Sequence, residues 1–131
     1  MRICNSQLVP VFSGIADQVI QPQDLISVLT GESLKLECQV ASGLSPGPVK
    51  WFLGNGPNRK LIYADKTHKE SERVTRHEES SDTDFTIILH NVTLKDAGTY
   101  YCVKQKKETG GDKDWKSGHG TEVVVKGERR K

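Results

Sequence analysis

Two cysteines and a tryptophan limit what this chain can fold into more than any other residues. Cys38 and Cys102 lie 64 positions apart, and Trp51 follows the first cysteine by 13 residues. Each cysteine falls at an inward position of a segment in which apolar and polar residues alternate. We expect a disulfide that joins two sheets through the core, with the indole of Trp51 packed against it. Closing a loop of this length would stabilise the fold by about 4 kcal/mol on the chain-entropy account, and the bond requires an oxidising compartment. The alternative is a pair of buried free thiols in a cytosolic protein.

Alternation continues through the middle of the chain, and polar turn segments separate the alternating runs. Leu34, Leu36 and Cys38 point one way, while the residues between them point the other way. We predict strands over residues 19–21, 25–29, 33–40, 49–53, 60–64, 74–77, 85–89, 99–105 and 121–126. Short strands at intervals of about 8–12 residues predict an all-β sandwich made of two antiparallel sheets.

The segment that leads into the second cysteine is the most specific local motif. Residues 96–102 read DAGTYYC. Tyr100, two positions before the cysteine, is where an immunoglobulin sandwich has a core tyrosine whose hydroxyl bonds back to the backbone. Asp96 starts the turn into this strand, and we expect it to form a structural ion pair with Arg73 rather than a catalytic pair. The motif disfavours the free-thiol alternative and favours an immunoglobulin-type sandwich.

Two further features indicate a variable-type domain. The distance between the cysteines leaves room for two extra strands, and residues 118–121, which read GHGT, match the bulged start of the last strand in such domains. Antibody and T-cell-receptor domains carry an aromatic residue before the first of these glycines, in the interface between paired domains. Ser117 stands there in this chain, so we expect a monomer.

Length and charge restrict the classes of partner. The chain has 131 residues, enough for one domain, and its formal net charge is +2. This near balance argues against nucleic acid or an anionic membrane as the main partner. No apolar run approaches the roughly 18–20 residues that span a bilayer. We expect a domain over residues 17–126, a disordered or non-native arm over residues 1–16 that makes a poor signal peptide, and a basic disordered tail over residues 127–131.

Catalytic and metal-binding patterns are missing from the sequence. The four histidines are scattered, with no pair at metal-ligand spacing. Residues 54–56, which read GNG, form a hairpin turn rather than a phosphate loop, because no helix follows. No serine lies in a nucleophile elbow. The sequence therefore predicts no enzyme, no cofactor and no small-molecule substrate.

Three other features have structural and functional readings. Asn91 begins the N-glycosylation sequon Asn91-Val92-Thr93, and we expect it to carry a glycan if the protein is secreted. Lysines crowd residues 104–116, but the acidic residues among them favour a solvated loop over a nucleic-acid site. Cys4 is left over; it could pair between chains, although an incidental cysteine in a non-native arm is the favoured reading.

Five segments together resemble the N-terminal variable domain of the signal-regulatory proteins. They are residues 18–22 (QVIQP), 47–52 (GPVKWF), 54–63 (GNGPNRKLIY), 96–104 (DAGTYYCVK) and 116–122 (KSGHGTE). The resemblance covers about residues 17–126. It implies an extracellular domain from a family of myeloid and lymphoid surface receptors and secreted members, with roles in immune-cell adhesion and signalling.

The resemblance also implies where a ligand would bind. In that family the ligand is a cell-surface protein, and the inhibitory member binds integrin-associated protein through loops at one end of the domain. The matching segments here are residues 42–48, 65–67, 78–84 and 104–114. The candidate ligand-binding residues are Gly43, Leu44, Ser45, Pro46, Asp65, Lys66, Thr67, Lys106, Lys107, Glu108, Thr109 and Asp112.

These loops depart from the ligand-binding pattern. The tip of the first loop is less apolar than in the binding members, and the third loop is shorter and acidic where the binding members have basic residues. We therefore favour an activating or secreted type of member that does not bind integrin-associated protein strongly. The remaining hypotheses are a domain that does bind this ligand and a vestigial product that has no ligand.

Overall fold

Short strands make up most of the chain that the structure describes. The computed structural model covers residues 18–65 and 73–127. In chain order the strands are β1 Val19–Ile20, β2 Leu25–Leu29, β3 Leu34–Leu36, β4 Gln39–Val40, β5 Val49–Leu53, β6 Lys60–Ala64, β7 Val74–Arg76, β8 Ile87–Leu89, β9 Gly98–Glu108, β10 Gly111–Ser117 and β11 Thr121–Lys126. A 3-10 turn, η1, spans Leu94–Asp96.

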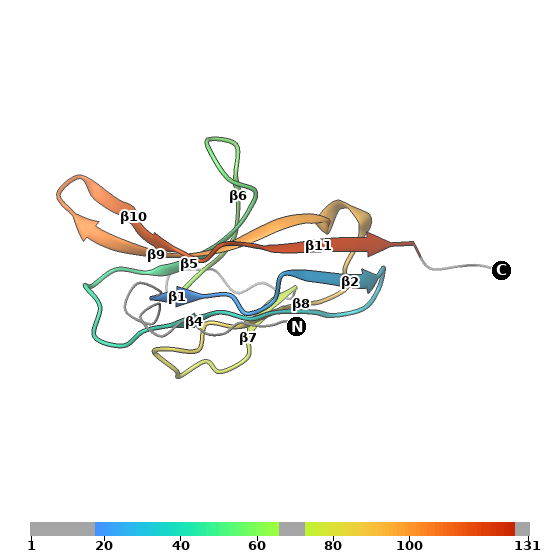
Figure 1. Cartoon of the computed structure of the whole chain (residues 1–131), viewed down its shortest axis with the longest axis horizontal. Helices are drawn as coiled ribbons and strands as arrows, with labels where there is room; N and C mark the ends of the chain where they lie inside the picture. The colour runs from blue at the N-terminus through green and yellow to red at the C-terminus, as the bar shows by residue number, and fades with distance from the viewer. Residues whose placement is uncertain (1–17, 66–72, 128–131) are drawn as a thin grey trace, which may run out of the picture.

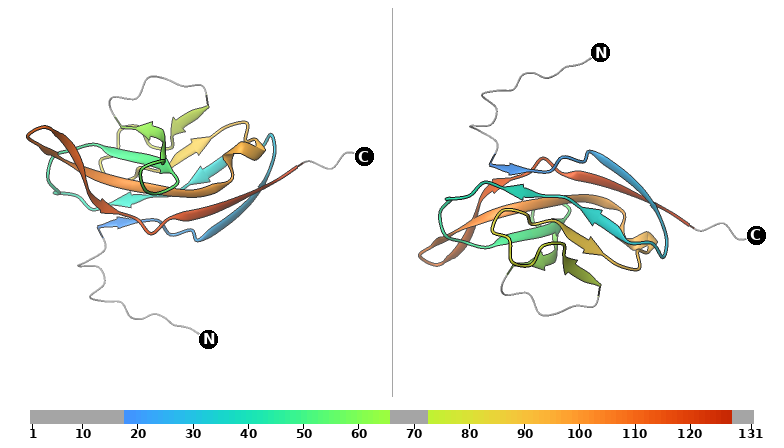
Figure 2. Two further views of the ribbon diagram at one scale, coloured as in Figure 1. Left: turned by 90° about the horizontal axis from the view of Figure 1, so that it is seen from above. Right: turned by 90° about the horizontal axis from the view of Figure 1, so that it is seen from below.

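The strands form two layers that face each other across the core (Figure 1). One layer is a six-stranded sheet in the order β2-β11-β9-β5-β6, with β10 paired to β9. The other layer holds a three-stranded sheet, β3-β8-β7, and a two-stranded sheet, β1-β4. All strand pairs are antiparallel except β2 with β11, which is parallel. The chain crosses from one layer to the other between β1 and β2, and this crossing sets β2 beside β11 in the same direction (Figure 2).

Several strands have the predicted bounds, namely β2, β5, β6 and β11. The strand predicted over residues 33–40 is instead divided into β3 and β4. Side chains break the ladder there: the N–H of Glu37 donates to Oε1 of Gln23 at 2.9 Å, and the N–H of Cys38 donates to Oγ1 of Thr86 at 3.2 Å. These two side chains take the place of a strand partner.

The largest error concerns residues 106–114, which were expected to form a solvated loop. They belong to a β-hairpin, because β9 continues to Glu108 and β10 begins at Gly111. Strand β10 has no apolar alternation, so the sequence pattern could not reveal it. Its partner is the well-defined β9, which supplies a backbone ladder from Gly111 opposite Glu108 to Ser117 opposite Val103. The hairpin tip lies at the opposite end of the molecule from the last residues of β11 (Figures 1 and 2).

The core is built around the predicted disulfide. Cys38 and Cys102 are bonded and have no exposed surface. Trp51 is also fully buried, and its indole N–H donates to the carbonyl oxygen of Phe85 at 2.9 Å. The indole therefore links β5 of one layer to the segment that leads into β8 of the other. The fold class is the variable-type sandwich that the sequence predicted.

Two buried polar side chains fix the backbone around β9. The hydroxyl of Tyr100 donates to the carbonyl oxygen of Asp96 at 2.6 Å, and burial raises the pKa of this phenol. Gln21, which the sequence analysis did not single out, donates to the carbonyl oxygen of Tyr100 at 2.9 Å. Its own carbonyl accepts from the N–H groups of Cys102 at 3.1 Å and Gly120 at 3.2 Å. The position of Gln21, a polar residue on the inward face of the predicted strand 19–21, was the sequence signal that could have indicated this buried role.

Candidate ligand-binding end of the sandwich

Segments from four parts of the chain meet at one end of the sandwich. They are the β4–β5 loop (residues 42–48), the residue after β6, the β7–β8 loop (residues 78–84) and the base of the β9–β10 hairpin. Together they line a cleft of about 270 Å³. Apolar side chains such as Val40, Val49 and Phe85 line it together with the charged residues Asp65, Asp82 and Lys104. The cleft joins most of the segments that were predicted to bind a ligand.

The β4–β5 loop is bonded along the free edge of β9. The N–H of Gln105 donates to the carbonyl oxygen of Pro48 at 2.8 Å, and the N–H of Lys107 donates to that of Pro46 at 3.0 Å. Gly47 lies between them with φ 150°, and a Cβ there would collide with the backbone of Gln105. Only glycine allows this close approach. The loop and the hairpin therefore form one continuous backbone ladder.

Lys104 joins the same two segments from inside. It is 6% exposed, and its Nζ donates to the carbonyl oxygens of Gly47 at 2.7 Å and Gln105 at 3.1 Å. Burial lowers the pKa of this lysine, and the charge of Asp112 partly opposes the shift. Lys104 was predicted to lie in a solvated basic stretch, which is wrong, because its ammonium group binds backbone carbonyls.

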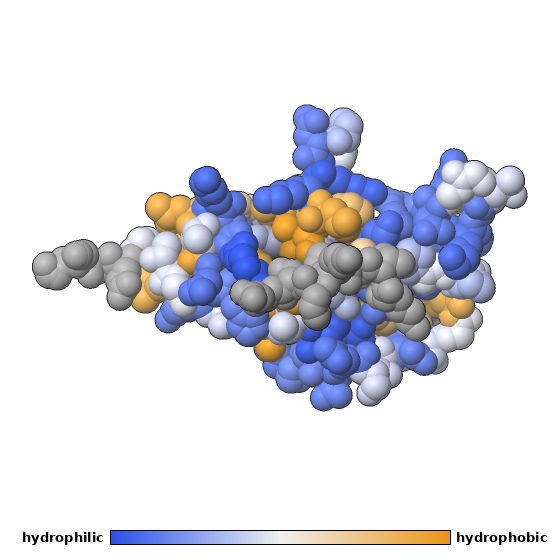
Figure 3. Space-filling model, turned by 180° about the vertical axis from the view of Figure 1, so that it is seen from behind, coloured by the Kyte–Doolittle hydropathy of each residue, from blue (hydrophilic) through white to orange (hydrophobic). Residues whose placement is uncertain are grey.

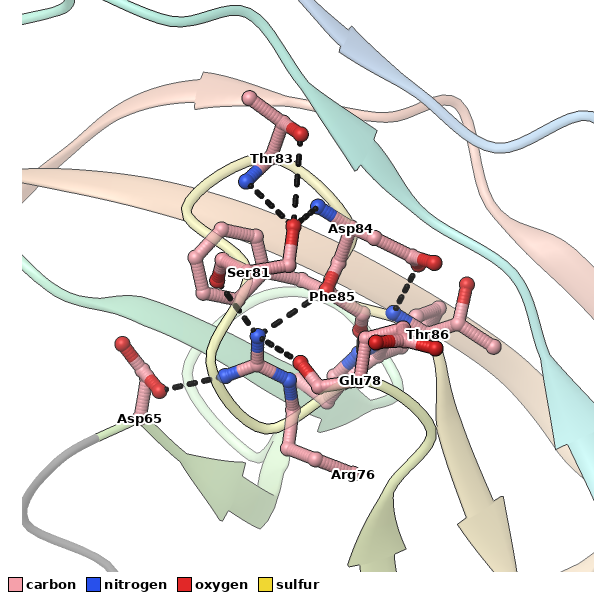
Figure 4. A network of polar contacts seen from close by, with 9 residues as sticks. Asp65, Arg76, Glu78, Ser81, Thr83, Asp84, Phe85 and Thr86 are labelled. Atoms are coloured by element: carbon pink, nitrogen blue, oxygen red, sulfur yellow. Dashed lines mark hydrogen bonds and ion pairs between the residues drawn. The ribbon is translucent and has the colours of Figure 1, made fainter.

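Arg76 holds the β7–β8 loop in the same way (Figure 4). Its side chain is 4% exposed and forms an ion pair with Asp65 at 2.7 Å. The guanidinium carbon lies 4.3 Å from the centre of the Phe85 ring. Its NH2 nitrogen also donates to three carbonyl oxygens of the loop, those of Glu78 at 2.8 Å, Ser81 at 2.8 Å and Asp84 at 3.0 Å. One buried cation therefore shapes the whole loop.

This network changes the role of two acidic residues. Asp65 was expected in a ligand-binding loop, but its carboxylate is turned inward to Arg76, which is a correction to that assignment. Asp84 accepts the backbone N–H of Thr86 at 3.1 Å. Burial opposes ionisation of Asp84, but hydrogen bonds from Thr86 outweigh it and lower the pKa of this carboxyl group. The exposed acidic side chains of this loop are those of Glu78, Glu79 and Asp82.

The outer side chains at this end are accessible and of mixed charge. In the β4–β5 loop Gly43 and Pro46 are exposed, while Leu44 and Ser45 are partly buried. On the hairpin the exposed predicted residues are Lys107, Glu108, Thr109 and Asp112, and Lys106 is partly buried, with its Nζ 5.1 Å from the centre of the Trp115 ring. The structure thus brings most of the predicted residues to one end, with a hairpin of mixed charge and an acidic β7–β8 loop.

A third cation, Arg59, braces the hairpin against the outer face of the six-stranded sheet. Arg59 bonds Asp114 of β10 through two contacts, at 2.7 and 3.2 Å, and this contact lowers the pKa of the carboxyl group. Gln105 donates to the same carboxylate at 2.8 Å. The guanidinium of Arg59 lies 3.7 Å from the centre of the Phe52 ring. Phe52 is therefore covered by its own chain and is only 7% exposed.

The opposite end holds the pair expected from the DAGTYYC motif. Arg73 and Asp96 are in contact at 2.7 Å. The carboxylate of Asp96 also accepts the N–H of Thr93 at 2.8 Å, which caps η1. Asn91 is exposed with φ 53°, and Val92 beside it is 1% exposed. The sequon therefore lies on an open turn at the opposite end of the sandwich from the candidate ligand-binding segments.

Some predictions fall outside the residues described. These are the arm over residues 1–16 with Cys4, the candidate residues Lys66 and Thr67, and the tail beyond Gly127. Within residues 18–65 and 73–127, no group of histidine, cysteine and acidic side chains could hold a metal ion. The same residues include no helix that is both long and apolar enough to cross a bilayer.

Comparison with known proteins agrees with the fold. Residues 20–126 match the family model of the immunoglobulin V-set domain. The chain is 48% identical to bovine (Bos taurus) tyrosine-protein phosphatase non-receptor type substrate 1, over 82% of this chain and 22% of that protein. It is 46% identical to human (Homo sapiens) signal-regulatory protein beta-1, over 83% of this chain and 28% of that protein. The first name describes a substrate of a phosphatase, not an enzyme. The chain spans about a quarter of the length of these relatives.

Proposed function

The chain belongs to the immunoglobulin V-set family as a domain of the signal-regulatory type, and we propose that it binds a cell-surface protein through the end formed by residues 42–48, residues 78–84 and the β9–β10 hairpin. In this proposal the domain acts outside the cell, in immune-cell adhesion and signalling. Its disulfide fits that location, because such bonds persist in oxidising compartments.

One observation carries the proposal: the loops at this end are held by internal bonds while their outer side chains stay accessible. Lys104 and Arg76 bind five backbone carbonyls of the surrounding segments. Loops held in this way lose less conformational entropy on binding, so more of the contact energy appears as affinity. Loops on a rigid scaffold are also where binding residues concentrate.

Integrin-associated protein is the ligand that the signal-regulatory resemblance suggests. The acidic side chains of Glu78, Glu79 and Asp82 favour weak or absent binding to it, because basic residues occupy this loop in the binding members. A reversed charge at an interface slows association and costs affinity. We therefore favour another cell-surface protein as the main ligand, one whose surface meets both a hairpin of mixed charge and an acidic loop.

The test is a direct binding measurement. The disulfide-intact chain is passed over the immobilised ectodomain of integrin-associated protein, with the variable domain of the inhibitory receptor as positive control. Dissociation constants in the low-micromolar range or below would assign this ligand. No binding by a folded, active sample would exclude it, and the same chain would then be used to stain intact leukocytes.

A matched pair of variants decides whether the proposed end is used. Lys107→Glu changes the charge of the hairpin, and Lys95→Glu makes the same change in η1 at the opposite end. Both lysines are exposed, so neither variant should unfold the domain. Binding of whichever ligand is found should weaken with Lys107→Glu and be unchanged with Lys95→Glu. Equal effects of the two variants would overturn the proposed site.

We also propose that the domain is a monomer. The sheet face that pairs in antibody domains carries Arg59 over Phe52, and the Arg59–Asp114 bridge lies beside it. Ser117 stands in place of the aromatic residue that such interfaces use. On the face seen in Figure 3, apolar residues form small groups separated by polar ones. Large apolar patches mark interfaces. Sedimentation at rising protein concentration tests this proposal, and the sedimentation coefficient should stay that of a monomer.

A second candidate is a secreted or vestigial domain product without this ligand. The acidic β7–β8 loop is the observation that favours it. Staining of leukocytes that is independent of Lys107→Glu, or no staining at all by the folded chain, is the result expected for this candidate. A conventional signal peptide in the upstream coding sequence would favour export and count against a vestigial product.

A further inference from the structure

The turn between β5 and β6 contains an exposed asparagine followed by glycine. The tip of this hairpin loop extends away from the two sheets (Figure 1). Asn55 and Gly56 are both exposed, and Gly56 has φ 89°. A Cβ built on Gly56 would meet no atom within 4 Å. The space around the peptide bond between these two residues is therefore open to solvent.

The three asparagines of the described residues differ in the backbone N–H that follows them. After Asn58, the N–H of Arg59 donates to the carbonyl oxygen of Gly56 at 3.2 Å. After Asn91, the N–H of Val92 donates to a carbonyl of another segment at 3.0 Å, and the valine side chain is buried. After Asn55, the N–H of Gly56 has no acceptor within residues 18–65 and 73–127.

We propose that Asn55 is a site of spontaneous deamidation and isoaspartate formation. The backbone nitrogen of Gly56 forms a bond to Cγ of Asn55, the side-chain amide leaves as ammonia with the proton from that nitrogen, and a five-membered succinimide remains. One water molecule then opens the ring. Opening between Cγ and nitrogen leaves an aspartyl residue, and opening at the main-chain carbonyl leaves an isoaspartyl residue whose backbone runs through Cγ.

The free N–H and the missing side chain of Gly56 are what single out this site. Attack requires the amide nitrogen to lose its proton and to swing toward the preceding side chain. A hydrogen bond on that N–H, as at Arg59 and Val92, opposes both steps. A β-branched side chain such as that of Val92 also crowds the approach, whereas glycine rotates freely.

The products would change the turn in two ways. Each adds one negative charge, and the isoaspartyl product also adds a methylene to the main chain. Arg59 lies at the other side of the same turn, where a Cβ on Gly54 would be 3.8 Å from the Cα of Arg59. The proposal is independent of the ligand-binding function, because this turn is not part of the proposed binding end.

Peptide mapping of aged protein tests the proposal. The 131-residue chain is made in a host that adds no glycans, so that Asn91 keeps a free amide, and is refolded with its disulfide. The folded chain is held at neutral pH and body temperature, and samples are digested rapidly under acidic conditions. Mass spectrometry detects the increase in mass when the side-chain amide group is replaced by a hydroxyl group. Isoaspartate methyltransferase detects the isoaspartyl product.

The expected result is modification that grows with time at Asn55, rises with pH, and is absent at Asn58 and Asn91. The variant Asn55→Gln should lose the signal, because the longer side chain would have to close a six-membered ring. Modification of Asn91 at the same rate as Asn55 would overturn the proposal. So would an Asn55 that reacts in the denatured chain but not in the folded chain, because the native turn would then protect it.

Discussion

Two arginine–aspartate pairs lie at the two ends of β7, and their surroundings differ. Both pairs are 2.7 Å apart. At the proposed ligand-binding end the Arg76 side chain is 4% exposed, and it binds three carbonyls of the β7–β8 loop in addition to Asp65. At the opposite end the Arg73 side chain is 45% exposed, although Asp96 is largely covered.

The two pairs therefore have different roles: the buried Arg76–Asp65 pair holds a loop in place, and the more exposed Arg73–Asp96 pair joins segments at the opposite end of the sandwich. A buried cation that loses its partners leaves uncompensated polar groups in a poorly solvated place, which is costly. When a half-exposed cation is removed, water can hydrate the groups that it contacted, so the loss of stability is smaller. The sequence motif points to Arg73 and Asp96, yet the pair that shapes the proposed binding surface is the one that no motif announces. Five changes test this comparison.

Removing the disulfide should have the largest effect on the free energy of unfolding. Because the disulfide lies between the two ends, its loss is the reference against which changes at either end are compared. The double variant Cys38→Ala with Cys102→Ala should lower the free energy of unfolding by about 4 kcal/mol, because the unfolded chain gains the entropy of an open loop. Since the bond joins the two layers in the middle, both ends should lose amide-exchange protection together. Loss at one end alone would contradict a single cooperative core.

Arg76→Met should come next. We expect a loss of about 3–5 kcal/mol, because Asp65 would remain charged and buried without its partner. Protection of residues 78–84 against hydrogen exchange should fall most. Denaturant unfolding gives the total effect. Adding Asp65→Asn should recover part of the loss, since it removes the orphaned charge, and no recovery would show that the carbonyl contacts dominate.

Arg73→Met is the matched change at the opposite end. We expect a loss of about 1.5 kcal/mol, the lower end for a hydrogen bond to a charged group, because Asp96 keeps the N–H of Thr93 and solvent reaches the site. Denaturant unfolding of the two methionine variants side by side measures the comparison. A loss as large as that of Arg76→Met would show that exposure does not set the ranking.

The Arg59–Asp114 pair is a third ion pair in which the effect of exposure can be tested, here through the pH dependence of the free energy of unfolding. The lowered pKa of Asp114 means that its contribution is present above the ordinary aspartate pKa of about 3.9 and is lost as the pH falls through the lowered folded-state pKa. Arg59→Ala should cost below about 1 kcal/mol at neutral pH and should flatten this acid dependence. It also uncovers Phe52, so sedimentation should detect more self-association than in the parent chain.

The glycan proposed at Asn91 gives the smallest effect. Asn91→Asp removes the sequon while keeping a residue that tolerates φ 53°. In protein from a secretory host, the variant should run as a smaller species, and enzymatic deglycosylation should remove the difference. Because the turn is exposed, the free energy of unfolding should change by less than about 0.5 kcal/mol. Ligand binding should be unchanged; a change would place the base of the sandwich in the binding site.

Residues that contribute apolar faces were predictable, and charged residues that became buried were not. The strands around Trp51 and Val123 have the predicted bounds, and around Val123 the alternation of buried and exposed residues leaves a period of two in the sequence. The hairpin strand β10 was missed, because its residues alternate only in charge. Asp65 and Lys104 were read as exposed, and each is buried against groups from another segment.

The sequence by itself determined the sandwich, its disulfide and the strands that enclose them. Those features follow from apolar periodicity and from two cysteines at inward positions, which act locally and leave a pattern. Only the tertiary structure decided which charges organise the proposed binding end. Lys104 and Arg76 are stable there because carbonyl groups from loops distant in sequence converge on them, and a convergence of backbone groups has no signature in the order of side chains.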